Sequence, residues 1–251
     1  MSRGKKFAIV GIVFALIVVI CWSLIYTINA NVSPALYIAH RGHGHYDNTA
    51  EAFYNSTDYW GIECDVRVTK DNQLILNHDP DVVFEDGITM TVAESNLVDL
   101  LSKKLDGGYS MCEFSTYLEI CEELGKVAVI ELKGEYTDNE ISMLINQIEQ
   151  YYDADKVVII SFSQNNLLKV KEQSSIELQY LFTENTPEAF QFCFDNDINP
   201  SINFARLKAE DVKNVHNHNL KIGVWTVNLM TANVLMKEFG VDFITSDYFC
   251  S

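Results

Sequence analysis

Residues 38–79, IAHRGHGHYDNTAEAFYNSTDYWGIECDVRVTKDNQLILNHD, decide the fold and carry most of the functional signal. Three apolar runs in this stretch contain or end in charged side chains, namely His40, Arg41, Glu63, Asp65 and His78. Side chains alternate along a strand, so Glu63 and Asp65 face the same side of the second run. Two carboxylates aimed at one point are either an unfavourable like-charge pair or a site for a hard cation.

A short turn at residues 69–72, Thr-Lys-Asp-Asn, joins the second and third runs. Such a connection is too short for a parallel crossover and suits an antiparallel hairpin. Counting back from the turn brings His78 level with Cys64 and Asp65. The loop length therefore predicts that a histidine lies beside the paired carboxylates.

Further along the chain, apolar runs typical of strands alternate with helical patterns. Strands are predicted at residues 36–40, 60–68, 126–133, 156–162, 177–182, 198–204, 221–227 and 242–245. Helices are predicted near 49–59, 113–124, 138–151, 163–173, 186–195, 207–218 and 230–239, with Ser163 and Thr186 as candidate N-caps. This order predicts a parallel TIM (β/α)8 barrel with a β-hairpin excursion after strand two. We expect the irregular segment 80–112 to cover the mouth of the barrel.

The N-terminus contains an uncharged run of 22 residues, 7–28, which is long enough for one transmembrane helix. Basic residues at positions 3, 5 and 6 precede this run, which places residues 1–6 in the cytoplasm by the positive-inside rule. We therefore expect a single-pass membrane anchor at 7–28, a linker at 29–35 and one extracytoplasmic domain at 36–251. A cleaved signal peptide is the alternative.

Charge narrows the choice of partner, because the chain has a formal net charge of −17. A chain this acidic offers no basic patch for a nucleic-acid backbone, so we exclude nucleic acid as a partner. Glycine-rich nucleotide-binding loops and the G-x-S-x-G elbow are absent from the sequence, which argues against kinases, dehydrogenases and serine hydrolases. The sequence carries no signal for the oligomeric state.

Barrel enzymes place their chemistry at the carboxyl ends of the strands, where several charged side chains of this chain should meet. These are His40 after the first strand, Glu63 and Asp65 in the second, and Glu131 and Lys133 at the end of the third. Three carboxylates embedded in apolar runs suit Mg²⁺ or Ca²⁺. Imidazoles flanking such a site suit acid–base catalysis on a phosphodiester.

Several motifs, taken in order, resemble the glycerophosphodiester phosphodiesterase family of phospholipase C-like TIM barrels. They are AHRG at 39–42, DNTAEAF at 47–53, GIECDVRVTKDNQLILNHD at 61–79, IELKGE at 130–135, VIISFS at 158–163, VWTVN at 224–228 and GVDFITSD at 240–247. The resemblance implies metal-dependent hydrolysis of a small glycerophosphodiester, or of a lipid head group of that kind, to glycerol phosphate and an alcohol.

The resemblance also implies roles for particular residues. The implied acid–base pair is His40 and His78, the implied ligands of Mg²⁺ or Ca²⁺ are Glu63, Asp65 and Glu131, and the implied contacts to phosphate or substrate are Arg41, Asn48, Lys133 and Trp225. One position departs from the family, which commonly has glutamate where this chain has Asp47. The shorter side chain puts the reach of Asp47 toward Arg41 in question.

Other functions remain open on the sequence alone. A phosphorus–oxygen lyase acting on lysophospholipid or sphingolipid would stop at a cyclic phosphate, and a non-catalytic barrel would only bind lipid head groups or cell-wall polymer. The residues do not decide the alcohol moiety, the metal, or the order of the two histidines. Because a hairpin could carry His78 over the leaving group, we expect His78 to be the acid.

Overall fold

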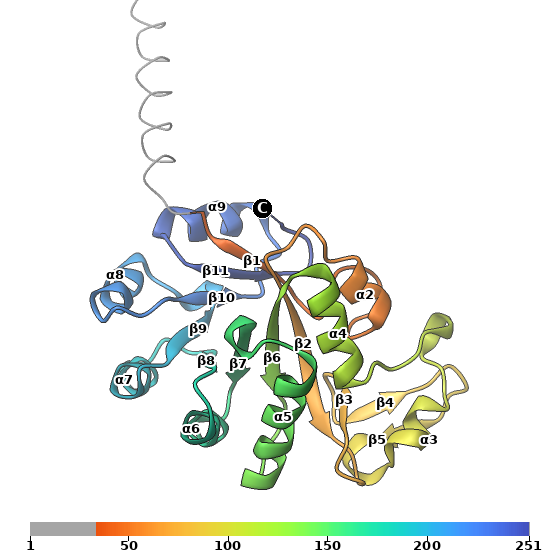
Figure 1. The fold of residues 1–251 in the computed structure, drawn as a ribbon. Helices are drawn as coiled ribbons and strands as arrows, with labels where there is room; N and C mark the ends of the chain where they lie inside the picture. The colour runs from red at the N-terminus through yellow and green to blue at the C-terminus, as the bar shows by residue number, and fades with distance from the viewer. Residues whose placement is uncertain (1–33, 251) are drawn as a thin grey trace, which may run out of the picture. The chain divides into compact units, whose positions relative to one another are not determined.

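The computed structural model describes residues 34–250, in which eight parallel strands close into a barrel (Figure 1). The barrel strands are β1 (Leu36–Ala39), β2 (Gly61–Val68), β6 (Val127–Leu132), β7 (Val157–Ser161), β8 (Glu177–Phe182), β9 (Asn199–Asn203), β10 (Gly223–Trp225) and β11 (Phe243–Ser246). Each strand pairs with its neighbours in chain order, and β1 pairs with both β2 and β11, which closes the ring. The predicted TIM barrel is confirmed.

Helices cover the outside of the barrel, and the seven predicted ones all form, six of them within a few residues of their expected ends. They are α2 (Ala50–Tyr54), α4 (Phe114–Leu124), α5 (Asp138–Tyr151), α6 (Gln164–Gln173), α7 (Pro187–Asn196), α8 (Ala209–Asn217) and α9 (Met230–Phe239). Ser163 and Thr186 cap α6 and α7 through their side-chain oxygens, as predicted. Only α2 is clearly shorter than expected.

Strand alternation divides the core into an inner and an outer part. Inward side chains such as Ile38, Val129, Ile160 and Leu181 pack together inside the barrel. Outward side chains of the same strands pack under the helices in two larger clusters. Because every barrel strand is buried on both faces, a charged side chain that points inward must find partners inside the barrel.

The predicted hairpin after the second strand is confirmed. Strand β3 (Leu74–Leu76) pairs antiparallel with β2, with Val66 opposite Leu76 and Val68 opposite Leu74. Beyond β3, the backbone N–H of Asn77 donates to the Asp65 carbonyl at 2.9 Å. This register places His78 beside the carboxylates, as the turn length predicts.

The segment at 80–112, which we expect to cover the mouth of the barrel, contributes no residue to the lining of the cavity there. It forms β4 (Asp81–Val83), β5 (Thr89–Thr91) and α3 (Leu97–Leu101), which lie beyond β3 at the side of the barrel (Figure 1). Apolar residues of the segment, among them Phe84 and Leu100, bury their own small core against Ile75 of β3. Residues 80–112 therefore form a small subdomain that packs against the hairpin.

Between residues 34 and 250, none of the helices is both long and apolar enough to cross a bilayer. The predicted anchor at 7–28 lies outside the described residues.

Candidate active site

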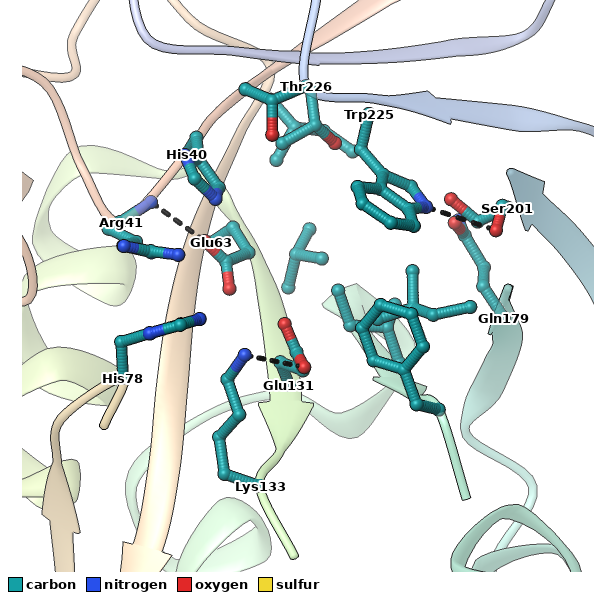
Figure 2. A pocket seen from close by; sticks show the side chains of 16 residues that line it. His40, Arg41, Glu63, His78, Glu131, Lys133, Gln179, Ser201, Trp225 and Thr226 are labelled. Carbon is teal, nitrogen blue, oxygen red and sulfur yellow. Dashed lines mark hydrogen bonds and ion pairs between the residues drawn. The ribbon is translucent and has the colours of Figure 1, made fainter. Parts of the chain in front are cut away.

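A cavity of about 160 Å³ opens at the carboxyl ends of the barrel strands (Figure 2). One half of its wall is charged and is formed by His40, Arg41, Glu63, His78, Glu131 and Lys133. With Trp225, the structure thus brings seven of the nine predicted site residues around one space. Trp225 lines the opposite half, and Asp65 lies behind Arg41 and Lys133, with which it pairs.

The end of β1 turns sharply to present His40 and Arg41 to the cavity. Arg41 has φ 56° and Gly42 has φ 81°, both in the left-handed region. A Cβ added at Gly42 would lie 2.8 Å from Ala52 of α2, which is too close for any side chain. Glycine is therefore required here, because it lets helix α2 pack directly under the turn.

Three buried carboxylates meet beside this turn. Glu63 and Asp65 occupy alternate positions of β2, and Glu131 lies opposite Asp65 on β6. Ligand atoms of all three lie within 4.8 Å of one another. Their exposed fractions are 2%, 0% and 8%, so water cannot be their main partner. The period-two alternation of the sequence predicts this cluster correctly.

Two cations offset part of the negative charge. The Lys133 ammonium lies 2.7 Å from Glu131 Oε1 and 3.1 Å from Asp65 Oδ1. The Arg41 guanidinium lies 3.1 Å from Asp65 through Nε and 3.2 Å from Asp47 through an outer nitrogen. Asp47 thus reaches Arg41 despite its shorter side chain.

The pKa values of the carboxyl groups diverge accordingly. Burial raises the pKa of Glu63 well above its usual value, and the charges of Asp65 and Glu131 raise it further. Burial also raises the pKa of Glu131, although Lys133 opposes the shift. Burial alone would raise the pKa of Asp65, but Lys133 and Arg41 outweigh that effect and hold it below its usual value.

This cluster could hold a divalent cation. Glu63 Oε2 accepts the backbone N–H of Arg41 at 2.7 Å. Its other oxygen, Oε1, is buried and has no hydrogen-bond partner within residues 34–250. A buried carboxylate oxygen without a donor, beside two further carboxylates, matches the hard oxygen ligands that Mg²⁺ and Ca²⁺ bind.

Both predicted histidines point into the cavity, and each is paired with an aspartate. His40 Nδ1 lies 2.7 Å from Asp247 Oδ1, and His78 Nδ1 lies 2.7 Å from Asp79 Oδ1. Because an ionised carboxylate only accepts hydrogen bonds, each Nδ1 carries the proton and each Nε2 is left free to act on a ligand. Burial lowers the pKa of His78, and the positive charges of Lys133 and Arg41 lower it further.

Two residues that hold these histidines were missed in the sequence. Asp247 follows β11 directly and was quoted only within a motif, although an aspartate just after a barrel strand is a usable signal. Arg67, in β2, donates to the carbonyl of Asn77 at 3.1 Å and to that of His78 at 2.5 Å. Arg67 therefore fixes the end of the hairpin that carries His78.

Asn48 does not line the cavity, which corrects its predicted role as a substrate contact. Its Nδ2 donates to Asp65 Oδ2 at 2.8 Å, and its Oδ1 accepts the backbone N–H of Asp65 at 2.9 Å. With both amide atoms committed and 5% of its surface exposed, Asn48 clamps Asp65 in place. Trp225 does line the cavity, where its ring meets Phe162 edge to face at 5.3 Å.

The fold and the cavity define a TIM-barrel enzyme with histidines and clustered carboxylates at the carboxyl ends of its strands. The sequence model of the glycerophosphoryl diester phosphodiesterase family matches residues 40–250. The chain therefore belongs to this family, and it is a glycerophosphodiester phosphodiesterase rather than a barrel that only binds its ligand.

Individual relatives agree with this assignment. A glycerophosphodiester phosphodiesterase from Caldanaerobacter subterraneus subsp. tengcongensis is 28% identical over 232 residues, which cover 84% of this chain and 93% of the relative. A crystal structure of a glycerophosphodiester phosphodiesterase from Parabacteroides distasonis has a TM-score of 0.75 at 22% identity and covers 85% of this chain and 92% of that one. The structure of a phosphodiesterase from Oleispira antarctica in complex with the product sn-glycerol-3-phosphate has a TM-score of 0.78 at 19% identity and covers 88% of this chain and 95% of that one. These two structures support the fold.

Proposed function

We propose that this enzyme hydrolyses glycerophosphodiesters to glycerol phosphate and an alcohol, with a divalent cation at Glu63, Asp65 and Glu131. The observation that carries the proposal is a cluster of three buried carboxylates, two of which line one cavity together with two histidines. The product complex of the Oleispira antarctica phosphodiesterase supports the same product here. The substrate is a small molecule or lipid head group that enters from the open side of the cavity.

Arg41 and Lys133 would bind the phosphoryl oxygens. Both cations line the cavity and are held in place by ion pairs with Asp65. Preorganised positive groups stabilise the charge that builds up on a phosphoryl group in the transition state. A bound Mg²⁺ or Ca²⁺ would add Lewis-acid stabilisation of the same charge.

The two histidines would divide the proton transfers, in the opposite order to the one expected from the sequence. The lowered pKa of His78 favours its neutral form, which suits a base. The side chain of its partner Asp79 is 74% exposed, whereas that of Asp247 is 37% exposed and receives a second hydrogen bond from Asn228. Since the lowered pKa of His78 suits the base, we assign His40, which the less exposed Asp247 holds in place, as the acid.

We also propose that residues 7–28 anchor the chain in the membrane and that the barrel is extracytoplasmic. The support is the uncharged run and the basic residues that precede it.

Phosphorus NMR of the products from glycerophosphocholine tests the proposed reaction. We expect glycerol 3-phosphate to accumulate with Mg²⁺ or Ca²⁺, and EDTA to stop the reaction until metal is restored. A cyclic phosphate as the end product would instead identify a lyase. Full turnover after exhaustive chelation would refute the metal assignment, and the absence of any turnover with added metal would refute the reaction.

A further inference from the structure

The half of the cavity opposite the carboxylates is neutral, and its side chains come from later strands. Phe162, Leu181 and Trp225 make it mostly apolar. Polar side chains interrupt this apolar wall, among them Gln179 of β8 and Ser201 of β9 (Figure 2), while Thr226 and Thr245 also line the cavity. No step of the proposed chemistry uses either of them.

Gln179 carries a buried side-chain amide. Its side chain points into the barrel, it is 2% exposed, and its Nε2 has no hydrogen-bond partner in the described part of the chain. Buried amide groups in folded proteins are nearly always hydrogen-bonded, because losing water without a replacement is unfavourable. An unpaired amide in the wall of a binding cavity is therefore available to a ligand.

Ser201 and Gly223 complete the environment of this amide. Ser201 is 4% exposed and lies opposite Gly223 in the register of β9 and β10. A Cβ added at Gly223 would lie 2.9 Å from Ser201 Oγ and 3.1 Å from Gln179 Oε1. Both polar groups thus border one small space, and only glycine at position 223 leaves that space open.

Trp225 closes the space from the side of the cavity. Its indole Nε1 donates to the Ser201 carbonyl at 3.1 Å, which fixes the ring against β9. The indole donor is therefore committed to the protein, and its ring presents an apolar face to a ligand. Of the polar side chains in the wall, Gln179 and Ser201 are the two that border the space beside Gly223, where they can recognise a polar atom.

We propose that Gln179 and Ser201 form a hydrogen-bonding subsite for the terminal hydroxyl of the substrate's glycerol arm. This inference rests on the proposed function, and it assigns the two arms of the diester to different sides of the cavity. The neutral half has no carboxylate to pair with an ammonium head group, and an acyl chain would leave both polar groups unpaired. A compact arm that ends in a hydroxyl can hydrogen-bond to the Gln179 amide and the Ser201 hydroxyl while its carbon atoms pack against the Trp225 ring.

The test compares glycerophosphocholine with its analogue that lacks only the terminal hydroxyl of the glycerol arm. Full-length wild type should prefer the complete substrate by about tenfold or more in kcat/KM, because the analogue leaves the amide unpaired. Gln179→Met and Ser201→Ala should each reduce this preference, Gln179→Met nearly to one. Gln147→Met, which changes a second glutamine with an unpaired buried oxygen on α5, should keep the wild-type preference.

Calorimetric binding of glycerol 3-phosphate to the same variants separates the subsite from the reaction. Weaker binding in Gln179→Met than in Gln147→Met supports the subsite, even if no diester is hydrolysed. The absence of hydrolysis would refute only the proposed function. Hydrolysis with a wild-type preference in both Gln179→Met and Ser201→Ala would refute the subsite and leave the proposed function intact. If Gln179→Met does not fold, Ser201→Ala, the smaller change, decides by the same two measurements.

Discussion

Replacing Asp247 with asparagine tests how His40 is held in its working orientation. Asp247 Oδ1 lies 2.7 Å from His40 Nδ1, and Oδ2 accepts a hydrogen bond of 2.6 Å from Asn228 Nδ2. The Asn228 amide cannot turn round, because its oxygen already accepts the backbone N–H of Asp247 at 3.0 Å. The direction of every hydrogen bond in this chain of groups is therefore fixed.

In Asp247→Asn, the introduced amide must turn its oxygen to Asn228 and its NH₂ group to His40. His40 Nδ1 must then accept a hydrogen bond, which moves the ring proton to Nε2 and disfavours the doubly protonated ring. Loss of a correctly held acid or base typically costs about 10² to 10⁴ in rate, which is about 3 to 5 kcal/mol of the barrier. The shape of the side chain is preserved, so the fold should be affected little.

Steady-state kinetics on glycerophosphocholine, over the pH range in which histidine titrates, measures this effect. We expect kcat to fall by the factor above, with little change in KM or Tm. Asp242→Asn is the matched control, since Asp242 lies 2.9 Å from His216 outside the cavity, and it should keep the wild-type kcat. An unchanged kcat and pH profile in Asp247→Asn would refute the positioning role.

Three further predictions concern the metal, the histidines and the topology. Glu63→Gln should abolish calorimetric binding of Mg²⁺ or Ca²⁺, and retained binding would remove Glu63 from the ligand set. Folding raises the pKa of Glu63, so in metal-free protein the contribution of Glu63 to stability is present at low pH and is lost as pH rises through that raised pKa. Glu63→Gln should therefore flatten the pH dependence of Tm. His40→Ala and His78→Ala should each lower kcat by about 10² to 10⁴ at nearly constant Tm. Only the variant of the acid should recover on a nitrophenyl ester, and recovery of His78→Ala would reverse our assignment. Protease added to intact cells should digest the barrel, whereas a protected barrel would contradict the proposed orientation and a barrel released to the medium would indicate a cleaved signal peptide.

Local periodicity accounts for what the sequence predicted well. The alternation of side chains along residues 61–68 is enough to place Glu63 and Asp65 on one face. The short turn at 69–72 is enough to set the register that delivers His78. The barrel follows from the regular order of strands and helices, because parallel neighbours need a helical crossover between them.

Contacts between distant parts of the chain account for what the sequence could not give. His40 and Asp247 are 207 positions apart and meet only because β1 pairs with β11 when the barrel closes. Asn48 belongs to a motif that suggests a ligand contact. Its backbone is left-handed, with φ 58°, and its side chain instead binds Asp65 of β2. Whether the Gln179 amide finds a hydrogen-bond partner depends on the side chains of neighbouring strands, and no local sequence pattern predicts this. Among residues 34–250, its Nε2 finds none.

The two halves of the cavity also explain why the sequence identified the reaction more readily than the substrate. The charged half comes from β1, β2, β6 and the hairpin, between His40 and Lys133, where charged residues in apolar runs are conspicuous. Most of the neutral half comes from β7 to β10, between residues 160 and 226, where its side chains resemble ordinary core residues. A phosphodiester needs charge at its phosphorus wherever it is bound, whereas its arms are distinguished by shape and by single hydrogen bonds. Substitutions in the charged half should therefore act mainly on kcat, and substitutions in the neutral half should act mainly on the ratio of kcat/KM between substrates.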